Sequence, residues 1–149
     1  MKLPPGATGF GPPPGARPDL RHFTAVCHQA ARAIDATVTD VTPAGVTPNF
    51  HTIDIRYAQH HISVLRHTVL PFIAFALPRA GGEISIAFVD HHDLAAAILN
   101  LTDARVLTVE QLRTPLAHID LTALGRHEHD QINYWKPNTL GELLFNFWD

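Results

Sequence analysis

One segment near the start of the chain repeats its hydrophobic side chains with the period of a helix. Between Leu20 and Ala36, apolar residues fall on one stripe of a helical wheel, while arginine, histidine and glutamine side chains occupy the opposite side. Asp19, which precedes this stretch, is a residue type that caps helix N-termini. The pattern predicts an amphipathic helix over Leu20–Ala36 that lies on a core, with Cys27 inside the buried stripe as an unreactive thiol.

Four later segments have patterns typical of β-strands. Apolar and polar residues alternate in Phe50–Tyr57 and in His61–His67, which indicates strands with one buried face. Leu70–Leu77 is apolar on both faces and predicts a central strand. Pro78–Gly82 is typical of a hairpin turn, after which Ile84–Val89 is expected to return. Because the connections are too short for parallel crossovers, we predict a four-stranded antiparallel meander.

The other segments alternate between loop and helical patterns. Thr37–Pro48 contains proline and glycine and is expected to be a loop. Helices are predicted at Asp93–Leu101 and Leu121–Trp135, followed by a last short helix capped by Thr139. Arg105–Val109 is a candidate fifth strand. We therefore predict a two-layer α+β domain, with an N-terminal amphipathic helix, the antiparallel meander, and C-terminal helices packed on one face.

Proline and glycine dominate residues 1–18. The six prolines and four glycines of this stretch argue against a regular helix or a central strand. We predict a flexible, extended leader that packs little, ahead of a single domain over residues 19–149. An alternative is that the triple proline, Pro12–Pro14, docks into an aromatic groove on a partner.

The composition excludes several kinds of chemistry. With 149 residues, 46% of them hydrophobic and 17% charged, the chain has the size and balance of one packed domain. Cys27 is the only cysteine, which excludes an intramolecular disulfide and a cysteine-based zinc cluster. Both serines lie in strand-like runs and no glycine-rich phosphate loop occurs, so we expect neither a serine hydrolase nor a phosphate-binding loop.

Charge and hydropathy bear on location and partners. The longest apolar run, Val69–Leu77, is well short of the roughly 20 residues that cross a membrane, and the first residues show no secretory signal, so we expect a cytoplasmic protein. Arginine and lysine form no cluster, so nucleic acid is not an expected partner. The preference for arginine over lysine indicates a GC-rich bacterial genome. Residues 83–149 carry ten acidic and four basic side chains, which either form a solvated surface or steer a basic partner.

Histidine is unusually frequent, with 11 residues. A zinc site needs side chains that converge, which means residues three or four apart on a helix or two apart on a strand. The adjacent pairs His60–His61 and His91–His92 diverge in either structure, and His127 and His129 diverge on a helix. A site assembled from different elements stays open. Its candidates lie in the predicted sheet region: His51, His61, His67, His91 and Asp54.

The run Asp90-His91-His92 follows a strand-like segment. It resembles the Asp-His-His signature of DHH-family phosphoesterases, although the Asp-rich metal motifs that precede it in that family have no counterpart and the chain is about half the size of that fold. A separate hypothesis is a metal-dependent hydrolase built from scattered histidine and aspartate residues, in which a divalent metal activates water. Its catalytic candidates are Asp54, Asp90, His91 and His92, the last three of them as metal ligands. The alternative is a structural role, in which Asp90 or Asp93 caps the following helix.

The C-terminal part is rich in aromatic residues. Tyr134–Glu142 combines two aromatics, a rigid turn and a helix cap, and is either a structural clamp or a recognition surface. The aromatic side chains of Phe145–Trp148 are expected to be tucked into the core or an interface. The residues expected to contact a partner are Tyr134, Trp135, Glu128, Asp130 and Glu142.

These observations favour a non-enzymatic interaction protein without a cofactor. An immunity or antitoxin-type partner of a toxin fits, as does a secretion-chaperone-like binder, and either would act by occluding its target. The expected partner is another protein, such as a co-encoded basic toxin or effector, or a second copy in a homodimer. The competing hypothesis is the metal-dependent hydrolase, with a divalent metal as its cofactor.

Overall fold

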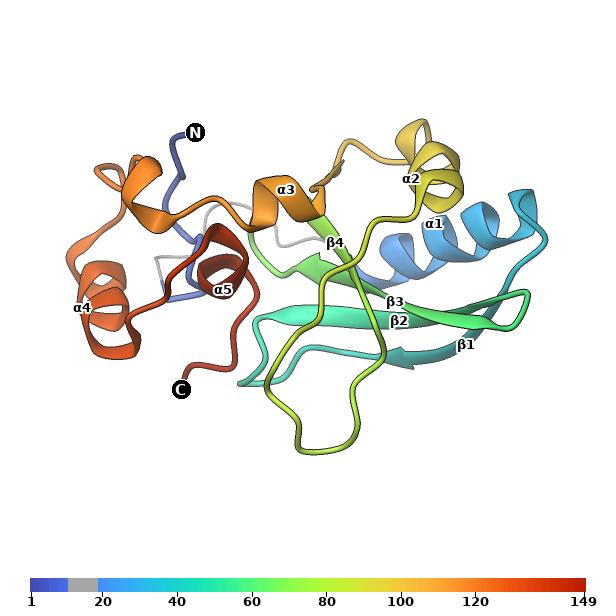
Figure 1. Cartoon of the computed structure of the whole chain (residues 1–149), viewed down its shortest axis with the longest axis horizontal. Coiled ribbons are helices and arrows are strands. Elements are labelled where there is room, and N and C mark those ends of the chain that lie inside the picture. The colour runs from blue at the N-terminus through green and yellow to red at the C-terminus, as the bar shows by residue number, and fades with distance from the viewer. Residues whose placement is uncertain (11–18) are drawn as a thin grey trace.

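A five-stranded sheet forms the centre of the computed structural model, which describes residues 1–10 and 19–149. Its strands lie side by side in chain order (Figure 1). They are β1 (Thr37–Thr42), β2 (Phe50–Tyr57), β3 (His60–His67), β4 (Phe72–Ala76) and β5 (Arg105–Val106). β1 to β4 pair antiparallel, which confirms the meander, and β5 pairs parallel with β4.

The helices lie around this sheet in two groups (Figure 1). They are α1 (Leu20–Ala33), α2 (His92–Leu99), α3 (Val109–Leu112), α4 (Arg126–Trp135) and α5 (Leu140–Leu144), with a 3-10 turn at Leu116–His118. α1 and α2 pack on one face of the sheet, and α3 to α5 join the core on the other, which confirms an α+β fold with the C-terminal helices on one face. None of the helices in the described part of the chain combines the length and hydropathy needed to cross a membrane.

α1 forms where the helical pattern predicts it. The side chain of Asp19 caps its first turn, and Cys27 is fully buried in its apolar stripe. The helix ends at Ala33, earlier than the predicted Ala36, because Asp35 adopts a left-handed backbone with a φ of 62°. The amphipathic pattern thus located the helix and its buried face, whereas the left-handed backbone of Asp35 determines where the helix ends.

The central strands β3 and β4 are largely buried on both faces. One face carries isoleucine and valine side chains of β2 to β4, which pack against α1 and α2. The other carries Phe50, Leu65 and Ala74, which pack against the C-terminal helices and the first residues of the chain. The domain therefore has three layers and not the two predicted, because β3 and β4 present apolar side chains on both of their faces.

Two strand assignments differ from the prediction. The first half of Thr37–Pro48, predicted as a loop, forms the edge strand β1, because β-branched threonine and valine dominate it. β1 contains a bulge between Val38 and Asp40. The predicted return strand Ile84–Val89 is an irregular segment with an isolated bridge from Phe88 to β4. The parallel strand β5 occupies the part of the β4 edge that a longer return strand would need.

Two further elements are shorter than predicted. Leu121–Trp135 is helical from Arg126 onward, because Gly125 has an extended backbone and forms the N-cap of α4. The candidate fifth strand Arg105–Val109 has two residues, because Thr108 starts α3 with a capping box. In both cases a helix cap inside the predicted segment determines the boundary.

The first ten residues pack closely against the domain. Leu3 and Ala7 are fully buried, and the N–H of Leu3 donates to the carbonyl oxygen of Asp120 at 3.1 Å. The prediction of a leader that packs little is therefore wrong for residues 1–10. The rest of the predicted leader, with Pro12–Pro14, lies outside the described residues.

Candidate functional site

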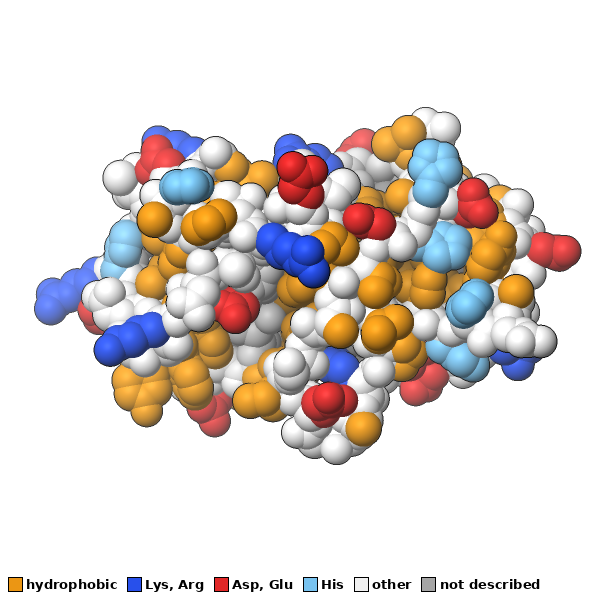
Figure 2. All heavy atoms as spheres, viewed as in Figure 1, with side chains coloured by type: hydrophobic (Ala, Val, Ile, Leu, Met, Phe, Trp, Pro, Cys, Tyr) orange, Lys and Arg blue, Asp and Glu red, His pale blue; other side chains and the backbone are white. Residues whose placement is uncertain are grey.

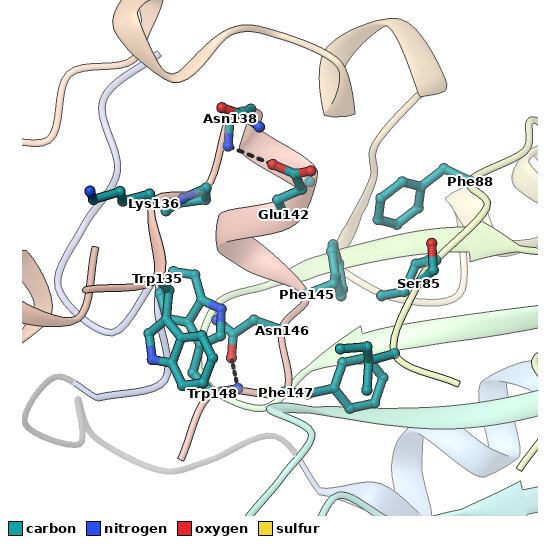
Figure 3. Close-up of a pocket in the computed structure, with 14 residues that line it drawn as sticks. Ser85, Phe88, Trp135, Lys136, Asn138, Glu142, Phe145, Asn146, Phe147 and Trp148 are labelled. Atoms are coloured by element: carbon teal, nitrogen blue, oxygen red, sulfur yellow. Dashed lines mark hydrogen bonds between the residues drawn. The ribbon is translucent and has the colours of Figure 1, made fainter. Parts of the chain in front are cut away.

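A groove lined largely by aromatic side chains lies beside the C-terminus, and we name it the aromatic groove (Figure 3). Its volume is about 410 Å³. Its walls come from the irregular segment before α2, from the turn between α4 and α5, and from the end of α5 with the residues that follow it. The lining residues are Ile84, Ser85, Ile86, Phe88, Trp135, Lys136, Pro137, Asn138, Gly141, Glu142, Phe145, Asn146, Phe147 and Trp148.

Two tryptophans form one wall of the groove (Figure 3). Trp135 is the last residue of α4, and its ring is parallel to that of Trp148 within 3°, with the centroids 6.2 Å apart. The indole N–H of Trp135 donates to the side-chain oxygen of Gln131 at 3.0 Å, which fixes the orientation of the ring. Tyr134 packs edge-on against Trp135 and is 76% exposed, so the wall continues onto the surface.

The turn between α4 and α5 is fixed by its own residues. Lys136 ends α4 with a left-handed backbone at a φ of 52°, and Pro137 follows. Thr139 then begins α5 with a capping box, in which its hydroxyl accepts the N–H of Glu142 and the Glu142 carboxylate accepts the N–H of Thr139. The turn holds the tryptophan wall in position, and the carboxylate of Glu142 is committed to this cap.

Phenylalanines form the opposite wall. Phe147 packs edge-on against Phe50 of β2, with ring centroids 5.5 Å apart. The guanidinium of Arg79 lies over both rings, 5.1 Å from the centroid of Phe50 and 4.8 Å from that of Phe147. Phe88, from the irregular segment, packs edge-on against Phe145 at 6.0 Å. The groove is thus anchored to the sheet through Phe50.

Asn146 holds the path of the residues that follow α5. Its side-chain amide donates to the carbonyl oxygens of Leu143 and Thr8, and its backbone N–H donates to the side-chain oxygen of Asn49. Its side-chain oxygen accepts the backbone N–H of Trp148 at 3.2 Å (Figure 3). The position of Trp148 therefore depends on a buried hydrogen-bond network that reaches the N-terminal residues.

Four of the five residues expected to contact a partner are at the surface. Trp135 and Glu142 line the aromatic groove, and Tyr134 adjoins Trp135. Asp130 is exposed on α4. Sequence reasoning thus located the α4 side of the groove, although the carboxylate of Glu142 serves the fold of the turn.

The placement of Glu128 at a contact surface is wrong. Its side chain is fully buried and accepts hydrogen bonds from the backbone N–H groups of Gly6 and Thr8 and from the hydroxyl of Thr8. The reason lies in the helix period, since Glu128 is four residues from Ile132, which is buried on the same helix. This spacing was the signal that assigns Glu128 to the inner side of α4.

The other wall was only partly predictable. The aromatic tail predicted burial or an interface for Phe145–Trp148, and Phe145 is buried while Phe147 and Trp148 are half-buried in the groove. Nothing in Ile84–Phe88 indicated a binding site, because a buried β-strand, the structure predicted for it, also accounts for its apolar residues. That these two segments meet is a result of the tertiary fold.

The Asp-His-His run has structural roles in the described residues. The carboxylate of Asp90 accepts the N–H of Val109 at 2.9 Å. His91, and neither of the predicted aspartates, caps α2, with its Nδ1 accepting the N–H of Leu94 at 3.1 Å. His92 is the exposed first residue of that helix. The side chains of Asp90 and His91 are therefore each bound to a different backbone segment.

The remaining metal candidates are also engaged separately. Asp54 accepts the hydroxyl of Ser63 at 2.5 Å, and Nδ1 of His51 accepts the N–H of Ala44 at 2.8 Å. His67 is fully buried on β3. Over residues 1–10 and 19–149, no three histidine, cysteine, aspartate or glutamate side chains are arranged to hold a metal ion. The geometry therefore gives the hydrolase hypothesis no ligand set in this part of the chain.

Comparisons of the chain with family models, with curated proteins and with solved structures give no match. The chemistry of the aromatic groove therefore rests on its own side chains. Flat apolar rings dominate it, and Ser85, Asn138 and Lys136 supply a few polar groups among them. This combination is typical of sites that bind a partner or ligand by burial of apolar surface.

Proposed function

We propose that this chain is a small, non-enzymatic protein-interaction domain that binds another protein through the aromatic groove. The observation that carries the proposal is that apolar side chains continue from the groove onto the surface, where Tyr134 is 76%, Ile84 73% and Trp135 39% exposed. Figure 2 shows hydrophobic side chains gathered at the end of the molecule where α4 and the C-terminus lie. Contiguous exposed apolar surface of this kind is typical of interaction sites.

The residue types of the groove suit the centre of an interface. Tryptophan and tyrosine are enriched among the residues that carry most of the energy of protein binding. Trp135 is held by Gln131 and by Trp148, so it loses little conformational freedom when a partner binds. A cavity of about 410 Å³ has room for a few side chains of a partner.

Charge favours a basic partner. Of the ten acidic residues in positions 83–149, all except the buried Glu128 are exposed. Their combined field attracts positive charge and speeds association. The class that we favour is an immunity or antitoxin-type protein that occludes a co-encoded basic toxin or effector in the bacterial cytoplasm, and a secretion-chaperone-like binder shares the same mechanism.

Co-expression with the products of neighbouring genes tests this proposal. A stable complex is expected, and its dissociation constant can then be measured with variants. We expect Trp135→Ala to weaken the complex at least tenfold, which corresponds to about 1.4 kcal/mol or more for the loss of a central interface tryptophan. Leu99→Ala is the matched control, because Leu99 is 71% exposed on α2 and does not line the groove.

Two results would contradict the proposal. If Trp135→Ala, shown by circular dichroism to be folded, binds as tightly as the Leu99→Ala control, the aromatic groove is not the contact surface. If none of the neighbouring products forms a complex with the unmodified chain, the proposed class of function is wrong.

A further inference from the structure

The first residues of the chain form a shaped segment that fits into the domain. We name Leu3–Gly9 the strap. Leu3, Ala7 and Thr8 are fully buried. Gly6 has a φ of 100°, a conformation that residues with a side chain rarely adopt. The strap is therefore fixed by its own backbone geometry as well as by its surroundings.

Glu128 of α4 holds the strap from one side. One carboxylate oxygen accepts the N–H of Gly6 at 3.0 Å. The other accepts the N–H of Thr8 at 3.0 Å and the hydroxyl of Thr8 at 2.6 Å. Hydrogen bonds to an ionised group are stronger than those between neutral groups, so this contact is a major attachment of the strap.

His67 of β3 holds the strap from the other side. Its Nε2 lies 2.8 Å from the carbonyl oxygen of Ala7, which only accepts, so Nε2 carries the proton. Its Nδ1 accepts the backbone N–H groups of Val69 and Leu70 at 3.0 and 2.9 Å. The ring is therefore neutral, with its proton on the nitrogen that faces the strap.

Two asparagines connect the strap to the aromatic groove. The side-chain amides of Asn49 and Asn146 both donate to the carbonyl oxygen of Thr8, at 3.4 and 3.1 Å. Asn146 also accepts the backbone N–H of Trp148, which forms the tryptophan wall (Figure 3). A strap that leaves its place removes one of the contacts that orient Asn146.

We propose that the strap is an acid-released latch: protonation of His67 frees it from the domain, and its release loosens the wall of the aromatic groove that Trp148 forms. A protonated Nδ1 has no lone pair for the N–H groups of Val69 and Leu70, and the resulting positive charge is buried. Release of the strap lets water reach the ring and removes this cost.

The surroundings of His67 contain groups that raise its pKa and groups that lower it. Burial is the largest influence and lowers the pKa of His67 to about 4. The Arg66 guanidinium next to it also lowers this pKa, whereas the carboxylate of Glu128 and the hydrogen bond to Ala7 raise it. Burial outweighs the two favourable contacts, so the closed strap resists protonation of His67.

Other titratable groups meet the ends of the strap. Hydrogen bonds from Thr122, together with Lys2 and the terminal amine, lower the pKa of Asp120. Its carboxylate therefore stays ionised at the pH values at which His67 is expected to be protonated. His127 packs edge-on against Phe10 at 5.5 Å and is exposed. His127 is thus not enclosed by the strap as His67 is.

The size of the effect follows from linkage. Under the closed strap the pKa of His67 is about 4, and release of the strap is expected to move it toward the ordinary histidine value of about 6.5, because water then reaches the ring. Between these values the released form holds one more proton than the closed form. The ratio of released to closed strap therefore rises about tenfold for each pH unit of acidification, and it is independent of pH above about 6.5.

Hydrogen exchange of the backbone amides of Gly6 and Thr8 measures this ratio directly. After correction for intrinsic exchange rates, we expect their protection to fall about tenfold per pH unit between pH 6.5 and 4, while the amides of β3 and α1 stay protected. His67→Gln removes the titrating ring and is expected to abolish this slope. His28→Gln, which changes an exposed histidine of α1, is expected to keep it.

Ring-carbon NMR signals of His67 in the unmodified chain provide a second measurement, needed if His67→Gln fails to fold. Protonation of His67 and exposure of the strap amides are expected to follow the same pH dependence. If the strap amides open while His67 stays neutral, or if His67→Gln keeps the parental slope, the latch proposal is wrong.

Tryptophan emission tests the link to the groove. Both tryptophans of the chain line the aromatic groove, so their emission is expected to shift in the pH range where the strap is released. An unchanged emission while the strap opens would overturn this part of the proposal. Because no partner is present in these measurements, their outcome is separate from that of the binding experiment above.

Discussion

Buried polar side chains determine how single residues hold the N-terminal part of this molecule. A carboxylate that leaves water loses its hydration, and hydrogen bonds must replace it. Glu128 obtains three such bonds from Gly6 and Thr8. Each donor also depends on Glu128, because these groups are buried with it. Loss of Glu128 would therefore also leave the buried donors of Gly6 and Thr8 without a partner. Loss of an acidic residue on the surface carries no such cost.

Glu128→Ala is therefore expected to destabilise the protein strongly. It leaves two buried N–H groups and one buried hydroxyl without their partner, and we expect the free energy of unfolding to fall by about 3 kcal/mol. Urea unfolding at pH 7 measures this change. Asp130→Ala, an exposed acidic residue on the same helix, is the control and is expected to have little effect. Equal effects of the two substitutions would contradict the assignment.

Cys27 illustrates the opposite case, a reactive group that burial makes inert. Burial raises the pKa of its thiol to about 12, so only about one molecule in ten thousand carries the thiolate at pH 8. We expect no reaction of the folded protein with a thiol-specific disulfide reagent over an hour at pH 8. The same reagent is expected to react at once in concentrated guanidinium chloride. Rapid reaction in buffer would show that the α1 stripe opens readily.

At the scale of elements, capping and close packing decide where the short helices lie. α3 and α5 each begin with a capping box, formed by Thr108 with Gln111 and by Thr139 with Glu142. Gly141 in the first turn of α5 has no space for a side chain, because a Cβ there would lie 2.7 Å from the ring of Phe88. α5 is thus positioned by its cap and by close contact with the groove wall.

Gly141→Ala separates helix propensity from packing. Propensity alone predicts a gain of about 1 kcal/mol in a helix, whereas the clash with Phe88 predicts a loss of about 1 to 3 kcal/mol. We expect the clash to dominate and the melting temperature to fall. Gly81→Ala is the control, since a Cβ at Gly81 meets no atom within 4 Å and Gly81 lies in a turn outside the helices. A raised melting temperature of Gly141→Ala would show that the ring of Phe88 can move aside at little energetic cost.

The elements that the sequence predicted well are those with a long period or a clear cap. The α1 stripe, the alternation in β2 and β3, and the Thr139 cap were each recognisable from neighbouring residues. β1 was not, because proline and glycine in the second half of its segment masked a short strand. Ile84–Val89 has strand-like residues, but the bridge from Phe88 to Ala76 places its first residues beyond the end of β4, where no partner strand continues.

At the scale of the whole molecule, the candidate site arises from contacts between distant segments. Trp135 and Tyr134 were predicted as contact residues from their own aromatic character. Their opposite wall and the Asn146 network join residues more than 90 positions apart, as in the bond from Asn146 to the side chain of Asn49. No local pattern encodes such pairings. Sequence reasoning therefore recovered one side of the aromatic groove and missed the strap, which is linked to the groove through Asn146.

The edge strand β1 has a consequence for how copies of this protein behave together. An open strand edge is a template on which another chain can add a strand, and bulges and inward charges prevent this. Asp40 lies at the bulge of β1 and opposite Asp54 of β2, so two like charges face each other there. This arrangement costs some pairing energy and makes the edge a poor template for a second chain.

We expect Asp40→Val to keep or raise the melting temperature and to shorten the lag before aggregates form in concentrated, warmed solution, as followed by light scattering. Asp103→Val, which makes the same change at an exposed loop position, is expected to leave the lag near that of the parent. An equal lag for both variants would contradict a protective role for Asp40. If the lag shortens for Asp40→Val alone, the bulge and its pair of like charges limit fibre-like association of the concentrated protein.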